Sequence, residues 1–143
     1  MKKESITNNP LQTRKLGEAL AKKFLKKRPK DKAIVVGLRG DLGGGKTTFS
    51  QGFAKGLGIR SRILSPTFII VRRTGYFYHI DCYRLQKPQE LLALGFKEIV
   101  STPENVIVIE WADRIHKIMP KNTTWIDFKL ISENERKITI NNF

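Results

Sequence analysis

The chain has 143 residues, which is enough for one hydrophobic core but not two, so we expect a single domain over residues 1–143. Its 40% hydrophobic content argues against a disordered protein, and no apolar run approaches the roughly 20 residues that a membrane span needs. The 27 basic residues exceed the 13 acidic ones, for a net charge of +14. This excess would attract nucleic acid, an acidic protein or anionic lipid, although a lysine-rich proteome would produce it equally well.

Two further features bear on the cellular compartment. The initial stretch MKKESITNN carries lysines without an apolar segment behind them, which argues against a signal peptide. Cys82 is the only cysteine, so no internal disulfide can form. We therefore expect a soluble cytoplasmic protein that does not associate with a membrane.

The first half of the chain predicts a helix, a buried strand and a second helix. The first helix has Asn9 as its cap and Pro10 in its first turn, and it ends before Pro29. Residues 33–38, AIVVGL, are continuously apolar and β-branched, which is typical of a strand buried on both faces. The second helix is expected over residues 46–58 and ends at a capping glycine.

The second half predicts a β-hairpin that turns at Thr74-Gly75, and then a helix that starts at Pro88. In that helix Leu91, Leu92 and Leu94 are expected to face inward. A buried strand over 105–111, a short helix over 113–119 and a terminal hairpin around the SENE segment complete the order. Together these elements predict an α/β fold: a P-loop NTPase-type domain with a mixed β-sheet flanked by helices.

The segment GDLGGGKTT contains the phosphate-loop pattern G-x-x-x-x-G-K-[ST]. Its glycines allow consecutive backbone N–H groups to surround one anion, and the helix behind them adds its positive end. Lys46 can reach the β and γ phosphates of a nucleotide, and the Thr47 hydroxyl can bind Mg²⁺. The strand before this pattern and the helix after it are the context that the motif requires.

Two carboxylates at the ends of expected strands are candidates for the chemistry. Glu110 follows the apolar run Val106–Ile109, as a Walker-B-type acid that binds Mg²⁺ would do, and Asp81 ends the stretch YFYHI, where it could orient a water. Spacing alone allows these two roles to be exchanged. An ion pair or a helix cap is the structural alternative for each of them.

The remaining polar candidates have simpler explanations. His79 lies on the same strand face as Asp81 but is more often a packed histidine than a catalyst. Trp111 and Arg84 are interpreted mainly as structural, and the Ser65-Pro66-Thr67 segment is either an ordinary turn or a loop that senses phosphate. The GTPase pattern N-K-x-D is absent from the sequence, and the only D-x-x-G pattern lies inside the phosphate loop.

Four segments together, GDLGGGKTTF, SPTF, YHIDCYRL and VIEWADRI, resemble the TsaE (YjeE-type) P-loop ATPases of bacteria, and the resemblance covers nearly the whole chain. It implies an ATPase that works with the TsaB and TsaD proteins in forming N6-threonylcarbamoyladenosine at position 37 of tRNAs that read ANN codons. Contact with the tRNA would be indirect, through that complex. Gly44 and Cys82 stand where the family pattern leads us to expect alanine and leucine.

The resemblance also implies roles for individual residues. Lys46, Asp81 and Glu110 would be catalytic, and Thr47 and Glu110 would bind Mg²⁺. ATP would be bound by a larger set: Thr13, Asp41, Gly43, Gly44, Gly45, Lys46, Thr47, Thr48, Trp111, Asp113 and Arg136.

Two other functions are compatible with the phosphate loop and the charge. A P-loop kinase would transfer phosphate from ATP to a small molecule or a protein. A nucleotide-dependent RNA-binding module would bind tRNA tightly by itself, with a steep dependence on salt.

Overall fold

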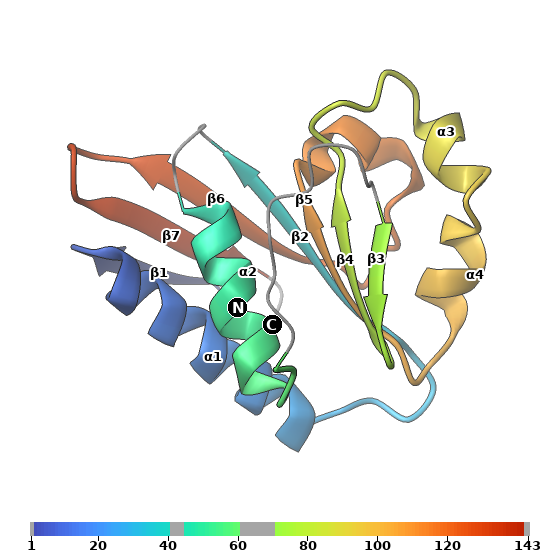
Figure 1. The fold of residues 1–143 in the computed structure, drawn as a ribbon, viewed down its shortest axis with the longest axis horizontal. Helices are drawn as coiled ribbons and strands as arrows, with labels where there is room; N and C mark the ends of the chain where they lie inside the picture. The colour runs from blue at the N-terminus through green and yellow to red at the C-terminus, as the bar shows by residue number, and fades with distance from the viewer. Residues whose placement is uncertain (1, 41–44, 61–70, 142–143) are drawn as a thin grey trace.

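The computed structural model describes residues 2–40, 45–60 and 71–141, which form one seven-stranded sheet with helices on both faces (Figure 1). The strand order is β1-β7-β6-β2-β5-β4-β3. The four strands β6, β2, β5 and β4 run parallel, whereas β1, β7 and β3 pair antiparallel with their neighbours. The expected α/β class with a mixed sheet is confirmed.

The central strands are β2 (Ile34–Gly40), β5 (Val106–Glu110) and β4 (Phe77–Asp81), and their residues are buried almost throughout. Burial on both faces explains why they read as continuous apolar runs in the sequence. Because the three strands are parallel, their carboxyl ends meet at one edge of the sheet. Glu110 is paired in register with Leu38 on one side and with Asp81 on the other.

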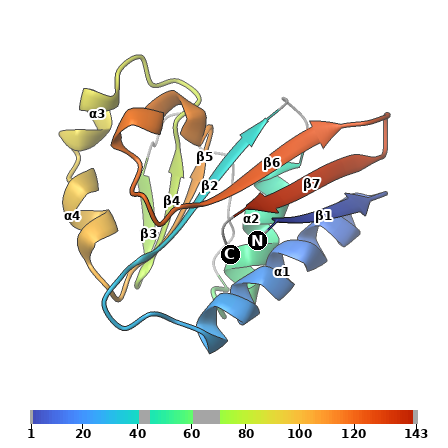
Figure 2. The ribbon, with the colours of Figure 1, turned by 180° about the vertical axis from the view of Figure 1, so that it is seen from behind.

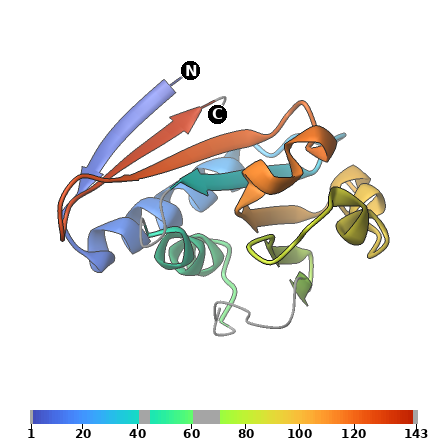
Figure 3. The ribbon, with the colours of Figure 1, turned by 90° about the horizontal axis from the view of Figure 1, so that it is seen from above.

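Helices α1 (Pro10–Lys26) and α2 (Lys46–Gly56) pack together on one face of the sheet (Figures 1 and 3). The Asn9 side chain accepts a hydrogen bond from the Gln12 N–H and caps α1, as the sequence predicts. The two helices come very close at Gly52, where an added Cβ would lie 1.8 Å from the Arg14 carbonyl oxygen. Only glycine fits at that crossing.

The opposite face of the central strands is covered by α3 (Pro88–Leu92), α4 (Phe96–Ser101) and the 3₁₀ helix η1 (Ala112–Ile118) (Figure 2). The single helix expected from Pro88 is in fact two short ones, since Gly95 has a φ of +87° and interrupts it. This break corrects one prediction: Leu91 is fully buried, but Leu92 and Leu94 are 40% and 53% exposed rather than facing inward.

Both expected hairpins are present. β3 (Val71–Thr74) pairs with β4 across a turn at Gly75, and β6 (Thr124–Leu130) pairs with β7 (Arg136–Asn141). The sequence did not predict β1 (Lys2–Thr7), which pairs along β7 and brings the two ends of the chain side by side (Figures 1 and 3). In the described residues, no helix is both long and apolar enough to cross a membrane.

Candidate functional site

The first turn of α2 carries the lysine of the phosphate-loop motif. Gly45 precedes it with a φ of +100°, a conformation that favours glycine. Lys46 is only 5% exposed; its ammonium group donates a hydrogen bond of 3.0 Å to the Gly40 carbonyl oxygen and lies 4.1 Å from the centre of the Trp111 ring. The lysine is therefore held at the carboxyl end of β2 by the backbone and by an aromatic face.

Thr47 and Glu110 meet at the same edge of the sheet, although 63 residues separate them in the chain. The Thr47 hydroxyl donates a hydrogen bond of 2.9 Å to Oε1 of Glu110. Glu110 reaches this point because it ends β5, which lies beside β2. A hydroxyl and a carboxylate side by side are hard oxygen donors of the kind that Mg²⁺ prefers.

The second oxygen of the same carboxylate is bound by a histidine. Nε2 of His79 lies 2.6 Å from Oε2 of Glu110, and both side chains are buried, at 0% and 3% exposure. His79 comes from β4, two residues before Asp81, and so projects from the same strand face. Among the described residues, each oxygen of Glu110 thus has a hydrogen-bond partner.

Asp81 ends β4 and is the register partner of Glu110. One of its oxygens, Oδ1, accepts a hydrogen bond of 2.9 Å from the Tyr83 backbone N–H. Burial raises the pKa of Asp81 above its ordinary value; the Tyr83 N–H lowers the pKa and the nearby Glu110 charge raises it further. A buried carboxylate with a raised pKa is a stronger base than a free one, which suits a group that would orient and deprotonate water.

Trp111 takes an unusual backbone conformation directly after Glu110. Its φ of 58° is the only positive φ found for a non-glycine residue in the described part of the chain. The Tyr83 ring packs edge-on against the Trp111 ring at 5.1 Å, and the Arg114 guanidinium lies within 6 Å of both ring centres. Such backbone strain is costly unless surrounding contacts enforce it, and it is concentrated at functional sites.

Thr13 lies behind the phosphate-loop helix. Its hydroxyl shares a 2.7 Å hydrogen bond with the Thr7 hydroxyl, and a Cβ added at Gly45 would stand 3.3 Å from the Thr13 methyl group. Thr13 of the first helix therefore lies beside Gly45, the residue that precedes Lys46.

The other expected nucleotide-binding residues are less closely tied to this cluster. Thr48 is half-buried in the first turn of α2, and Asp113 is exposed on η1. Arg136 begins β7, and its guanidinium donates to the Glu133 carbonyl oxygen. Asp41, Gly43 and Gly44, like the Ser65-Pro66-Thr67 segment, lie outside the described residues.

From the sequence, His79 is expected to be a packed histidine, but in the structure it contacts the Glu110 carboxylate. Its period-two spacing from Asp81 places it on the correct face, which is the only signal that the chain offers. Its partner Glu110 lies 31 residues further along, and their contact depends on β4 and β5 being neighbours in the sheet.

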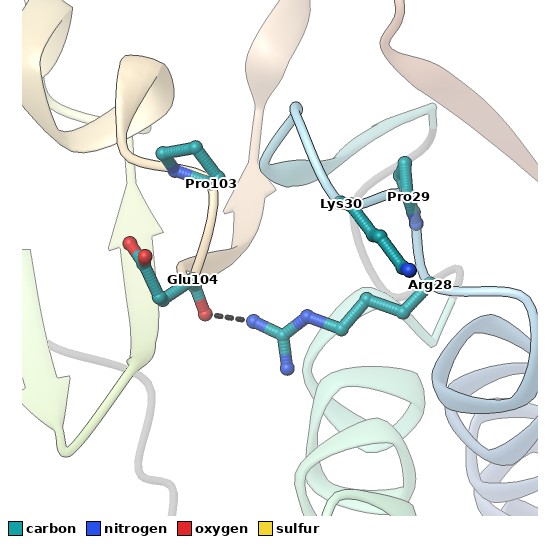
Figure 4. A pocket seen from close by; sticks show the side chains of 5 residues that line it. All are labelled: Arg28, Pro29, Lys30, Pro103 and Glu104. Atoms are coloured by element: carbon teal, nitrogen blue, oxygen red, sulfur yellow. Dashed lines mark hydrogen bonds between the residues drawn. The ribbon is translucent and has the colours of Figure 1, made fainter.

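A separate pocket of about 230 Å³ lies at the opposite edge of the sheet, before the amino ends of β2 and β5. Figure 4 shows the Arg28 guanidinium reaching across it to the Glu104 carbonyl oxygen. The guanidinium also lies over the Tyr76 ring. Arg28 thus joins the end of α1 to the chain before β5, far from the strand ends that hold Lys46 and Glu110.

The cluster formed by Lys46, Thr47, Asp81 and Glu110 combines oxygen donors with a positive charge, so its side chains could hold a magnesium nucleotide. In the described residues, no group of three or more His, Cys, Asp or Glu side chains is arranged to hold a metal by itself. Thr47 and Glu110 supply two oxygen donors, and Mg²⁺ usually completes its shell with phosphate oxygens and water. Lys46 and the start of α2 provide the matching positive charge for the phosphates.

Comparison with known proteins identifies the family to which the chain belongs. The family model for threonylcarbamoyl adenosine biosynthesis protein TsaE matches residues 7–138. The tRNA threonylcarbamoyladenosine biosynthesis protein TsaE of Bacillus subtilis is 39% identical over 137 residues, which cover 93% of this chain and 81% of that protein. Its counterpart in Rickettsia felis is 36% identical over 140 residues, 94% of this chain and 77% of that protein. The crystal structure of Bacillus subtilis YdiB matches with a TM-score of 0.78 at 31% identity, over 98% of this chain and 84% of that one. The chain therefore belongs to the TsaE family of threonylcarbamoyl adenosine biosynthesis proteins.

Proposed function

We propose that this chain is a Mg²⁺-dependent ATPase that serves the TsaB and TsaD proteins as an accessory factor. The product of that system would be N6-threonylcarbamoyladenosine at position 37 of tRNAs that read ANN codons. Family membership supports the place in tRNA modification. The identity of the two partners and of the tRNAs follows from the family resemblance of the sequence motifs.

The observation that carries the ATPase proposal is the contact between Thr47 and Glu110 beside the ammonium group of Lys46. A hydroxyl, a carboxylate and a buried cation converge at the start of a helix, as the β and γ phosphates of a magnesium nucleotide require. When bound, Mg²⁺ would neutralise part of the phosphate charge. Thr47 and Glu110 are the side chains that would hold it.

The other residues of the cluster have complementary roles in this proposal. Lys46 and the amides at the start of α2 would stabilise negative charge on the β and γ phosphates. Asp81, at the adjacent strand end, would orient the attacking water and accept its proton. Trp111 would pack beside the nucleotide and keep the Lys46 side chain in place.

Lys46→Ala tests the ATPase proposal. Loss of the ammonium group should lower the rate of phosphate release about a hundredfold or more, because one preorganised electrostatic contact contributes several kcal/mol to the transition state. Lys55→Ala is the matched control, since Lys55 is an exposed lysine in the last turn of the same helix. Phosphate release by the Lys46 variant at the wild-type rate would contradict the proposal.

The same preparation separates the two rival functions. With γ-labelled ATP, an ATPase releases the label as inorganic phosphate, whereas a kinase transfers it to an acceptor. An RNA-binding module would bind tRNA tightly by itself, with an affinity that falls steeply with salt and responds to ATP without turnover. Either of these results would replace the ATPase proposal.

A further inference from the structure

Packing alone does not explain why a histidine is buried at position 79, in contact with Glu110. His79 stands on the strand face that packs against α2, where its neighbour two residues earlier, Phe77, is part of the hydrophobic core. An apolar side chain could fill the same space without the cost of burying a polar ring. Instead, this position holds an imidazole, whose Nε2 lies 2.6 Å from Oε2 of the Glu110 carboxylate.

The direction of this hydrogen bond follows from the chemistry of the two groups. An ionised carboxylate can only accept, so Nε2 of His79 carries the hydrogen and donates it to Oε2. The second nitrogen, Nδ1, is buried and has no hydrogen-bond partner among the described residues. Among the described residues, the contact with Glu110 is therefore the hydrogen bond that orients the His79 ring.

This bond determines how Glu110 is oriented. With Oε2 held by His79, the other oxygen faces the Thr47 hydroxyl at 2.9 Å. Without the imidazole, the carboxylate could rotate about its side-chain bonds and leave Thr47. Ligands of metal ions are commonly oriented by an outer partner of this kind, and its loss typically weakens metal affinity 10- to 100-fold.

We propose that His79 is a positioning residue, whose Nε2–H holds Glu110 against Thr47 and thereby increases the affinity of the nucleotide complex for Mg²⁺. The inference rests on the proposed function, because Thr47 and Glu110 act there as the magnesium ligands. In this proposal His79 acts through its contact with Glu110 and is not itself a ligand of the metal.

The test compares two amide substitutions that differ by one methylene group. In His79→Gln the amide nitrogen can stand where Nε2 stands and donate to Glu110, whereas in His79→Asn the shorter side chain stops near the position of Nδ1. His116→Gln is the matched control, because His116 is exposed on η1 and stacks on Trp125. His79→Leu adds an apolar replacement that cannot donate at all.

The measurement is a calorimetric titration of Mg²⁺ into each full-length variant saturated with a non-hydrolysable ATP analogue. Affinity for the analogue in EDTA and thermal unfolding are recorded on the same samples. We expect Mg²⁺ affinity to fall about 10- to 100-fold in His79→Asn and His79→Leu and by no more than about threefold in His79→Gln and His116→Gln. Affinity for the analogue in EDTA should change little in any variant.

Three results would overturn the inference. If folded His79→Asn retains the wild-type Mg²⁺ affinity, the imidazole only fills space; if His79→Gln is as impaired as His79→Asn, the donated hydrogen is not what matters. If the wild-type chain shows no Mg²⁺-dependent binding of the analogue, the proposed function fails and the inference fails with it. Because that last result is observed in the wild-type chain, it separates a failure of the proposed ATPase function from a failure of the role proposed for His79. Should the leucine variant not fold, the comparison of glutamine with asparagine still decides.

Discussion

Helix α2 carries Lys46 and Thr47 and packs closely against α1 at Gly52. The substitution Gly52→Ala tests this close packing of the two helices. The added Cβ would lie 1.8 Å from the Arg14 carbonyl oxygen and 2.6 Å from its carbonyl carbon, whereas ordinary contacts begin at 3.4 Å. Both atoms belong to the backbone and cannot move aside by a change of rotamer. The helices would therefore have to separate by roughly 1.5 Å, which removes dispersion contacts from the core between them.

The expected cost combines two opposing terms. Overpacking of this kind costs about 1–3 kcal/mol or more, and the separated helices also lose contacts around Phe49 and Phe53, which are fully buried. Replacing a helical glycine by alanine by itself stabilises the helix by about 1 kcal/mol. We expect a net loss of about 2 kcal/mol in the free energy of unfolding, which lowers the Tm by roughly 7 °C in a chain of this size.

Thermal unfolding followed by circular dichroism measures this effect, with Gly58→Ala as the control. Gly58 has a φ of +83° and nothing within 4 Å of an added Cβ, so its substitution reports backbone strain without a clash. We expect the Gly58 variant to lose only about 1 kcal/mol. A Tm for Gly52→Ala within 2 °C of the wild type, on the order of 0.5 kcal/mol, would refute the close packing of the two helices.

Three other predictions concern single side chains. Burial raises the pKa of the Cys82 thiol to about 12, so iodoacetamide at pH 8 should leave the folded chain unmodified and alkylate it in urea; rapid alkylation of the folded chain would contradict this. Leu91→Ala should cost about 2–5 kcal/mol in urea unfolding and Leu92→Ala less than 1, because the first side chain is fully buried and the second 40% exposed; equal losses would count against the broken helix. The folded-state pKa of Asp81 is raised, so its ionisation lowers stability as the pH rises above 3.8. Asp81→Asn keeps an oxygen for the Tyr83 N–H and should raise the Tm at pH 7 but not at pH 3, while ATP hydrolysis is lost; a lower Tm at pH 7 would contradict the assigned burial penalty.

Local signals in the sequence were sufficient to predict most of the helices, strands and turns. The Asn9 cap, the buried runs that become β2 and β5, and the turn at Gly75 each act over a few residues, and each was predicted. β1 was missed because KKESIT has no apolar alternation, and the strand forms by pairing with β7 from the other end of the chain. The break at Gly95 was missed because leucine spacing alone does not reveal a positive φ.

The candidate site was predictable in part for a similar reason. Parallel strands deliver the side chains at their carboxyl ends to one edge, so the meeting of Asp81 and Glu110 could be expected. Which of them contacts Thr47 depends on strand order, and the structure places Glu110 there. The hydrogen bond between His79 and Glu110 depends on the same strand order and on the register of β4 with β5. Neither can be predicted from short stretches of the sequence.

In the proposed function, ATP hydrolysis at the cluster formed by Lys46 and Glu110 sustains tRNA modification. The most direct measurement is the yield of N6-threonylcarbamoyladenosine over many turnovers in a system reconstituted with TsaB, TsaD and tRNA. We expect the yield to continue rising with the wild-type chain and to stop near a single turnover when the chain is omitted or replaced by Glu110→Ala. An undiminished multiple-turnover yield without this chain, or with the Glu110 variant, would contradict the proposed role of ATP hydrolysis.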